Sequence, residues 1–507
     1  MLSEFKNGTP PALPTSFNMA AWVLQHAVDL GDKPALEVIR AGAKDSLSFS
    51  QVESAVRGIG TGLLSDGLKP GDTVLMRLDN TPEFPLCYLA CIAVGLIPVP
   101  TAAQLTGPEV AKLCSVVNPS TIIASPGVPL PDVPPCKVLM ADDLKAMHSL
   151  PPADYDMGDP HRLAYIIFTS GTSGVQRAVC HAHRAILARQ MMMQGWYGLT
   201  QQDRLMHAGA FNWTYTLGTG LMDPWTIGAT ALIPEPGTSA SALPALMSEH
   251  RATIFAAAPG VYRQLLKDEQ NLTLPELRHG LSAGEKLPNS TRKAWNNATN
   301  TKIFEAFGMS ECSTFISGAP GYPAPAGSLG RPQPGRHVAI LGPDNQPVPM
   351  GQEGEICVCR DDPGLMLTYL NAPDDTAMRF SGRWFRTGDS GSMDDTGAIT
   401  YLGRADDMMN AGGFRVSPIE VESALTQHPD VQECAVVELP VKADVSVIAA
   451  FYVAQNDPGE DVLKPWLSDH LAHYKMPRMF IPVSAVPRGA NNKILRRKLR
   501  EDWKASQ

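Results

Sequence analysis

The sequence lacks the long apolar run that a membrane-spanning helix requires. Its longest apolar stretch, Pro85–Pro100, is too short to cross a bilayer and contains prolines and a glycine. It predicts a buried helix followed by a strand, and we expect no membrane partner. Residues 1–17 show no charged-then-apolar signal design, and residues 504–507 show no anchor or retention signal. These absences favour a cytoplasmic protein.

Positive charge is also in short supply. The 42 Lys and Arg residues are outnumbered by 51 Asp and Glu residues, which gives a net charge of -9. This balance argues against nucleic acid or an anionic membrane as the main partner. A net negative charge is still compatible with a local basic pocket that binds a phosphorylated molecule.

Cysteine is sparse and scattered. Of the nine cysteines, Cys357 and Cys359 share one face of an alternating, strand-like run, but no further Cys or His lies near them at metal-ligand spacing. We therefore expect free thiols in a reducing cytosol and no zinc site.

What is present is an ordinary globular composition, with 44% apolar and 18% charged residues over 507 positions. A chain of this length is too long for one core, so two or more domains are expected. Strands alternate with helices over residues 71–124 and 204–256, which is typical of mostly parallel sheets covered by helices. Residues 126–160, rich in Pro and Asp, predict a covering loop.

The predicted fold class is α/β, but the pattern of predicted secondary structure changes towards the C-terminus. Short alternating runs from Gly327 to Leu402 indicate an all-β section, such as a small barrel. We expect residues 1–403 to form a large N-terminal domain. Residues 404–507 then form a small, mobile α+β domain, joined by a polar hinge near Asp406.

A Ser/Gly loop, Thr169–Arg177, follows a predicted buried strand at 164–168. Glycines let a backbone approach a ligand closely, amides and hydroxyls wrap phosphate oxygens, and a guanidinium grips them bidentately. This composition is equally compatible with a simple surface turn, so the rest of the chain must decide.

Further segments in order along the chain resemble the motifs of the adenylate-forming superfamily, which contains acyl-CoA synthetases, adenylation domains of peptide synthetases and luciferases. After the Ser/Gly loop they are Ser282–Glu285, Phe307–Glu311, Trp384–Asp389, Gly403–Asp407, Gly412–Arg415 and Asn491–Ile494. The resemblance covers nearly the whole chain, and within the superfamily it is greatest to the benzoate- and medium-chain acyl-CoA synthetases. It implies activation of a carboxylic acid by ATP and Mg²⁺ to an acyl-adenylate and pyrophosphate, followed by transfer to coenzyme A with release of AMP.

The resemblance also implies roles for individual residues in binding the nucleotide. Those expected to bind ATP or AMP are Thr169, Ser170, Gly171, Thr172, Ser173, Gly174, Gly284, Glu285, Phe307, Asp389 and Arg404. Of these, Gly284, Glu285 and Phe307 would shape the adenine pocket. Arg177 would hold the β- and γ-phosphates, Ser310 would touch the α-phosphate, and Glu311 would hold Mg²⁺, a cation that favours oxygen ligands. A solvated turn acid is the alternative for Glu311.

The two half-reactions would use different parts of the C-terminal domain. By resemblance, Lys493 bridges the substrate carboxylate and the α-phosphate; alternatively it is one more cation of the basic tail, residues 496–500. Rotation about Asp406 would then exchange Lys493 for Gly412, Gly413, Phe414 and Arg415, whose glycines leave room for the pantetheine arm of CoA.

The acyl pocket is expected at His207, Phe211, Trp213, Tyr215 and Gly308. Acetate-activating relatives carry a Trp at the position of Gly308, and its absence here leaves space that the aromatic residues would line. The sequence therefore favours an aryl or a short- or medium-chain acid. For His207, packing and a pocket role are equally compatible.

Two departures from the family pattern keep alternatives open. The loop ends Gln176-Arg177-Ala178 where the family has Pro-Lys-Gly, and Asn492 replaces a Gly. Arg keeps the charge of Lys but adds a planar fork. A ligase that charges a carrier protein or stops at the adenylate, and a non-catalytic nucleotide sensor, are the rival interpretations. Self-association into a homodimer is left open.

Overall fold

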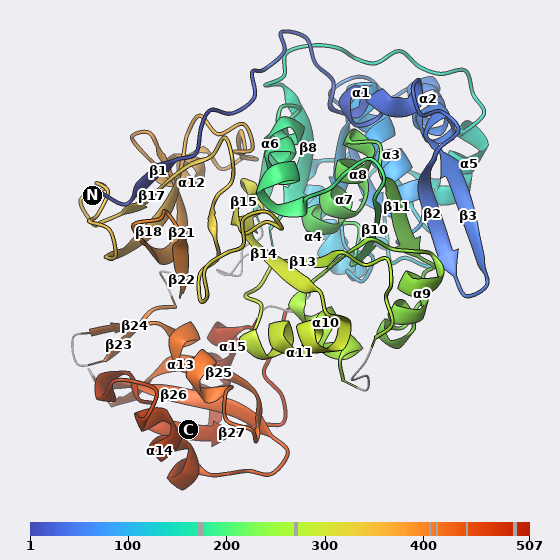
Figure 1. The fold of residues 1–507 in the computed structure, drawn as a ribbon. Helices are drawn as coiled ribbons and strands as arrows, with labels where there is room; N and C mark the ends of the chain where they lie inside the picture. The colour runs from blue at the N-terminus through green and yellow to red at the C-terminus, as the bar shows by residue number, and fades with distance from the viewer. Residues whose placement is uncertain are drawn as a thin grey trace.

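The computed structural model describes residues 1–169, 177–267, 272–404, 407–411, 414–442, 445–489 and 494–506. The part of the chain beyond residue 407 gathers into a small body beside the much larger remainder, as Figure 1 shows. Among the described residues, no helix combines the length and the apolar character needed to cross a membrane.

A nine-stranded sheet forms the centre of the large body, with parallel pairs in the middle and antiparallel pairs at both ends. Its order is β16 (Arg331–Pro332), β15 (Ser313–Ser317), β14 (Lys302–Met309), β13 (His279–Ala283), β12 (Ile254–Ala257), β10 (Arg204–Ala208), β11 (Thr230–Pro234), β2 (Pro34–Arg40) and β3 (Ala43–Ser48). Its inner strands are short and almost fully buried, because helices cover both faces. The predicted parallel α/β organisation is confirmed.

A second parallel sheet has the order β5 (Ile97–Pro100), β4 (Thr73–Arg77), β6 (Thr121–Ala124) and β7 (Lys137–Met140). Helix α3 (Glu83–Ala93) is buried on every side before the chain enters β5, as predicted for the long apolar run. The expected covering loop at 126–160 is wrong in part, since it contains β7 and helix α5 (Ala141–Met147). The segment is rich in proline and aspartate, and this loop-like composition hid the two short elements from the sequence analysis.

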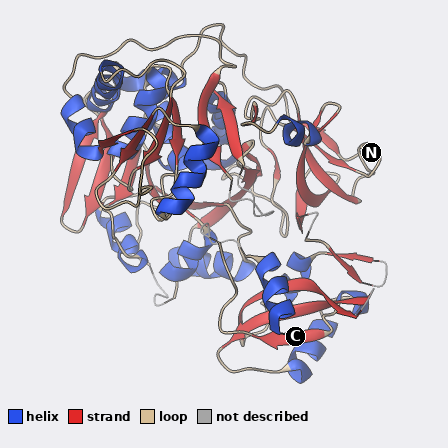
Figure 2. Cartoon of the chain, turned by 180° about the vertical axis from the view of Figure 1, so that it is seen from behind, coloured by secondary structure: helices blue, strands red, loops and turns tan. Residues whose placement is uncertain are grey.

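Helices occur throughout the large body, on the outside of its strands (Figure 2). Besides α3 and α5 they are α1 (Met19–Val23), α2 (Phe49–Ser65), α4 (Gly107–Val117), α6 (Ala185–Met192), α7 (Thr214–Leu217), α8 (Asp223–Thr226), α9 (Leu243–Glu249), α10 (Pro259–Leu265), α11 (Asn289–Thr299) and α12 (Pro373–Met378).

Two antiparallel sheets complete the large body. One has the order β19 (Thr368–Tyr369), β9 (Ala178–Ala182) and β8 (Leu163–Phe168). The other joins β1 (Glu4–Lys6), β17 (His337–Leu341), β18 (Glu353–Cys359), β21 (Trp384–Met393), β20 (Phe380–Ser381) and β22 (Ile399–Arg404). The second is the β section expected at 327–402, and the N-terminal strand β1 lies along it (Figure 1).

The small body is an α+β unit with its own apolar cores. Strands β25 (Val431–Lys442), β26 (Val445–Ala454) and β27 (Met479–Pro482) form its sheet, and β23 (Met409–Ala411) pairs with β24 (Phe414–Val416). Helices α13 (Pro418–Leu425), α14 (Glu460–Ser468) and α15 (Arg496–Ser506) pack on it. A small C-terminal α+β domain is thus confirmed.

Candidate active site

The two ends of the Ser/Gly loop lie side by side, because β8 and β9 pair as a hairpin with Phe168 opposite Ala178. The amide of Thr169 donates to the Arg177 carbonyl (2.9 Å), and the Arg177 amide donates to Oγ1 of Thr169 (3.2 Å). Ser170, Gly171, Thr172, Ser173 and Gly174 lie outside the described residues, as does Gln176. Phosphate binding by these residues stays a prediction.

Arg177 already has an anionic partner within the protein. Its Nη2 lies 2.6 Å from Oδ2 of Asp375 on α12, and its side chain is 38% exposed. Phosphate oxygens of a nucleotide would compete with this carboxylate for the same guanidinium. The arrangement fits a cation that is held in position near the site yet still accessible.

Glu311 and Ser310 follow directly after β14, where the notably short connection to β15 turns the chain. The hydroxyl of Tyr369 donates to Oε1 of Glu311 over 2.7 Å, and the carboxylate is largely buried. The ring of His181 donates from Nε2 to the Ser310 carbonyl (2.8 Å) and stacks on Tyr165. Glu311 is therefore a positioned acid and not a solvated turn residue.

Asp389 and Arg404 meet across the paired strands β21 and β22. Nη1 of Arg404 and the hydroxyl of Tyr401 each donate to the Asp389 carboxylate over 3.1 Å. The ring of Tyr401 lies 5.3 Å from that of Phe307. The structure thus brings three of the predicted nucleotide residues together around one tyrosine.

Gly284 is required by the close approach of an aromatic ring. Its φ is +97°, and a Cβ at this position would lie 2.4 Å from the indole of Trp213. The predicted adenine turn, Gly284–Glu285, therefore lies against the predicted acyl pocket. Glu285 in turn lies 3.4 Å from the guanidinium of Arg488, a residue of the small C-terminal body.

Lys493, the predicted catalytic lysine, lies outside the described residues together with residues 490–492, but the segment up to residue 489 and the segment from Ile494 onwards are described. Arg488 and Ile494 form an antiparallel bridge, and the amide of Leu495 donates to the Pro487 carbonyl (2.9 Å). Because Arg488 contacts Glu285, the segments that flank Lys493 lie near the adenine turn.

The predicted CoA and hinge residues are only partly visible. Gly412, Gly413 and Asp406 lie outside the described residues, and of Phe414 and Arg415 the structure describes only the backbone, in β24. Their roles stay predictions.

The predicted acyl-pocket residues fall into two groups. The rings of His207, Tyr215 and Trp213 form one contiguous series, with centroids 4.6 Å and 5.2 Å apart. Phe211 is separate, because its ring packs edge-to-face on Phe84 of α3. Burial, with the Arg189 guanidinium nearby, lowers the pKa of His207 to about 3, so that its ring is neutral.

Gly308 has a structural requirement of its own. A Cβ at this position would lie 2.2 Å from the Ser313 carbonyl oxygen, because β15 approaches closely here. The glycine therefore permits the β14–β15 pairing. The additional space for a substrate that we inferred from the missing indole stays a prediction.

Several residues at the site were not predicted from the sequence. Tyr369 holds Glu311, Tyr401 holds Asp389, and Asp375 pairs with Arg177. Asn80 binds the segment before Trp213 at two points, donating to the Gly209 carbonyl (2.8 Å) and accepting from the Phe211 amide (2.9 Å). Asn80 follows β4, and polar residues just after parallel strands are a usable signal for a site.

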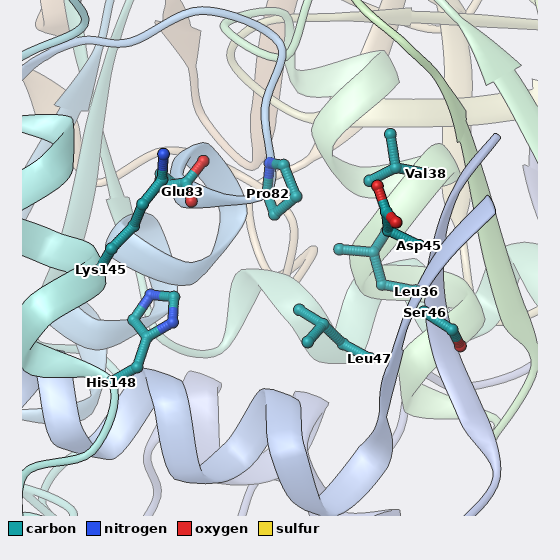
Figure 3. Close-up of a pocket in the computed structure, with 9 residues that line it drawn as sticks. All are labelled: Leu36, Val38, Asp45, Ser46, Leu47, Pro82, Glu83, Lys145 and His148. Carbon is teal, nitrogen blue, oxygen red and sulfur yellow. The ribbon is translucent and has the colours of Figure 1, made fainter. Parts of the chain in front are cut away.

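A separate cavity of about 380 Å³ opens between the β2–β3 hairpin and helices α3 and α5 (Figure 3). Leu36, Val38, Asp45, Ser46 and Leu47 of the hairpin line one side, and Pro82, Glu83, Lys145 and His148 line the other. None of them is a predicted site residue, so this cavity is distinct from the candidate active site.

Comparison with known proteins agrees with this geometry. Residues 24–370 match the model of the family described as "AMP-binding enzyme", and residues 420–493 match "AMP-binding enzyme C-terminal domain". The mitochondrial acyl-coenzyme A synthetase ACSM3 of Pongo abelii is 29% identical over 99% of this chain and 92% of its own length.

Two solved structures are similar along almost their whole length. The anthranilate CoA ligase AuaEII, in complex with anthranoyl-AMP, is 27% identical with a TM-score of 0.87, covering 97% of this chain and 98% of that one. A benzoate CoA ligase from Burkholderia xenovorans LB400 is 26% identical with a TM-score of 0.85, covering 96% and 100%.

Proposed function

Since the chain belongs to the AMP-binding enzyme family and is an AMP-forming acid–CoA ligase, we propose that its acid is an aryl or a short- or medium-chain carboxylic acid. The acid and ATP give an acyl-adenylate and pyrophosphate, and coenzyme A then displaces AMP. The observation that carries the choice of acid is the aromatic series at Trp213 and Tyr215, which lies directly against the adenine turn at Gly284.

Adenylation brings two anions together, so the protein's main task is to neutralise charge and align the reactants. Arg177 supplies a cation beside the Ser/Gly loop, and a nucleotide phosphate would displace Asp375 from it. Asp389 would accept hydrogen bonds from the ribose hydroxyls, in an orientation fixed by Tyr401 and Arg404.

Glu311 fits a role in holding Mg²⁺. Its carboxylate is an oxygen ligand, and Tyr369 fixes its orientation. Among the described residues, no three His, Cys, Asp or Glu side chains are grouped to hold a metal by themselves. Glu311 would therefore share the cation with phosphate oxygens of ATP, and the bound cation would neutralise their charge.

We place the domain boundary between residues 403 and 404, with Asp406 as the hinge. Lys493 would act in adenylation, with its flanking segment placed by Arg488 on Glu285. Rotation of the small domain would then bring Gly412, Gly413, Phe414 and Arg415 to the site for transfer to CoA. The lack of nucleic-acid and membrane partners and the homodimer stay predictions.

The test is ATP consumption with Mg²⁺ and CoA over acetate, butyrate, octanoate, benzoate and substituted benzoates, with AMP and pyrophosphate quantified. We expect AMP release that requires both acid and CoA, with the highest kcat/KM for an aryl acid or for a short- or medium-chain acid larger than acetate. A preference for acetate would contradict the proposed acid. AMP release that responds only to a thiolated carrier protein would contradict CoA as the acceptor.

A further inference from the structure

In and beside the His207–Tyr215–Trp213 series, two side chains bury polar atoms that have no partner in the described part of the chain. Both ring nitrogens of His207 and Oγ1 of Thr216 make no hydrogen bond within the described parts of the chain. His207 is 1% exposed and Thr216 is fully buried. Buried polar groups in native proteins are nearly always paired, so these atoms point to a hydrogen-bonding partner that arrives with a ligand.

Two of these unpaired atoms, Oγ1 of Thr216 and Nδ1 of His207, lie around Gly209. A Cβ at Gly209 would lie 2.4 Å from Oγ1 of Thr216 and 3.3 Å from Nδ1 of His207. On the other side of the imidazole, a Cβ at Gly220 would lie 2.7 Å from the His207 Cβ. Tyr215 meets the imidazole edge-to-face, and such a contact can occupy one ring nitrogen at most.

The local charges exclude an ionised partner. The imidazole is neutral at physiological pH, because burial holds the pKa of His207 near 3. Arg189, the cation that acts on His207, is paired with the buried carboxylate of Asp223 (2.6 Å) and also donates to Oγ of Ser313 (2.7 Å). A second carboxylate or an ammonium group on the acid would therefore be buried without a counter-ion.

We propose that His207 and Thr216 recognise an uncharged substituent of the acid, a hydroxyl or an aromatic amino group, and thereby select a hydroxy- or amino-substituted aryl acid. A neutral imidazole offers one donor and one acceptor, and a threonine hydroxyl offers both. These groups match a substituent that both donates and accepts. This inference rests on the proposed acid–CoA ligase function.

The test compares kcat/KM for benzoate with that for its 2-, 3- and 4-hydroxy and amino derivatives, measured as AMP release. We expect one substituted acid to exceed benzoate by at least about 100-fold, because a site built for a hydrogen bond rejects an analogue that lacks it. The preference should be the same from pH 6 to pH 9, since the imidazole does not titrate there.

Variants separate recognition from packing. Thr216→Val, which keeps the shape, should lower the preference about ten-fold or more, and His207→Phe should bring it close to one, while Thr216→Ser retains it. Thr230→Val is the matched control, because that buried hydroxyl is already bonded to the Pro34 carbonyl (2.7 Å) and lies on β11. It should leave the preference unchanged.

The two possible failures are distinguishable. Equal use of benzoate and its derivatives, or a preference that Thr216→Val and His207→Phe leave unchanged, would overturn recognition by these residues and assign the polar atoms to a buried water. AMP release with none of the acids would overturn the proposed function itself and this inference with it.

Discussion

At the scale of single residues, the sharpest prediction concerns Lys493. We expect Lys493→Ala to slow adenylation by about 10²–10³-fold, because in the proposed mechanism this lysine neutralises the charge that develops between the carboxylate and the α-phosphate. The measurement is ATP–pyrophosphate exchange with the best acid. Lys498→Ala, a cation of the following helix, is the control. A near-normal exchange rate in Lys493→Ala would contradict the catalytic role and would mean that this residue is one more cation of the basic tail.

Tyr369 carries a second residue-scale prediction. Its hydroxyl holds one oxygen of Glu311, so Tyr369→Phe should leave this carboxylate poorly oriented. We expect the Mg²⁺ concentration for half-maximal adenylation to rise about ten-fold, as is typical when a partner of a metal ligand is removed. Tyr322→Phe is the control, because Tyr322 is 61% exposed. An unchanged Mg²⁺ dependence would show that Tyr369 does not contribute to Mg²⁺ binding.

At the scale of elements, Asn80 ties the end of one sheet to the wall of the acyl pocket. Its side chain makes two hydrogen bonds to the backbone between β10 and α7. We expect Asn80→Ala to raise the KM for the acid about ten-fold, by loosening that segment, while the KM for ATP stays the same. Asn7→Ala, which breaks a similar amide–carbonyl bond to Pro332, is the matched control. Equal changes in both KM values would indicate general disturbance of the fold.

A second element-scale prediction concerns the contact between the two bodies. Arg488 lies 3.4 Å from Glu285 and also binds Glu433 within its own body. We expect Arg488→Gln to slow ATP–pyrophosphate exchange by about ten-fold and to affect CoA transfer from a preformed adenylate less, because the proposed rotation of the small domain would break this contact before the second half-reaction.

Its control is Lys464→Ala, which removes an exposed ion pair with Glu460 on α14. Equal loss in both half-reactions would mean that Arg488 only stabilises the small body.

At the scale of the whole molecule, four buried histidines predict the response of stability to pH. Burial lowers the pKa of His181 and His279 to about 4, and that of His183 and His207 to about 3, from an ordinary value of 6.5. Below pH 6.5 the unfolded chain binds protons that the folded chain does not. Folded stability is therefore fully present above pH 6.5 and falls as the pH drops towards 4.

Each of these histidines should contribute up to about 2 kcal/mol to the loss between pH 6.5 and pH 5. Urea unfolding at the two pH values measures the sum, and His279→Gln should reduce the loss while exposed His473→Gln should not. A free energy of unfolding that is flat over this interval would show that these rings are protonated in the folded state.

Most of the elements and the family follow from the sequence alone. Alternating apolar runs predicted the strands of the parallel sheets, the apolar run at Pro85–Pro100 predicted a buried helix and strand, and the ordered motifs indicated the family. These features are local, because secondary structure and loop chemistry follow from the spacing of neighbouring side chains. Short elements hidden among prolines, such as α5, were missed for the same reason.

Which distant side chains meet depends on how the elements pack in three dimensions. Tyr369 reaches Glu311 across 58 residues of sequence, and Asn80 reaches the Phe211 amide across 131. Arg496, a cation of the basic tail, is half-buried and forms an ion pair with Glu422 (2.7 Å). A sequence pattern states that a side chain is buried or polar, but its partner depends on how the sheets and helices pack. Positions that are far apart along the chain become neighbours only through that packing.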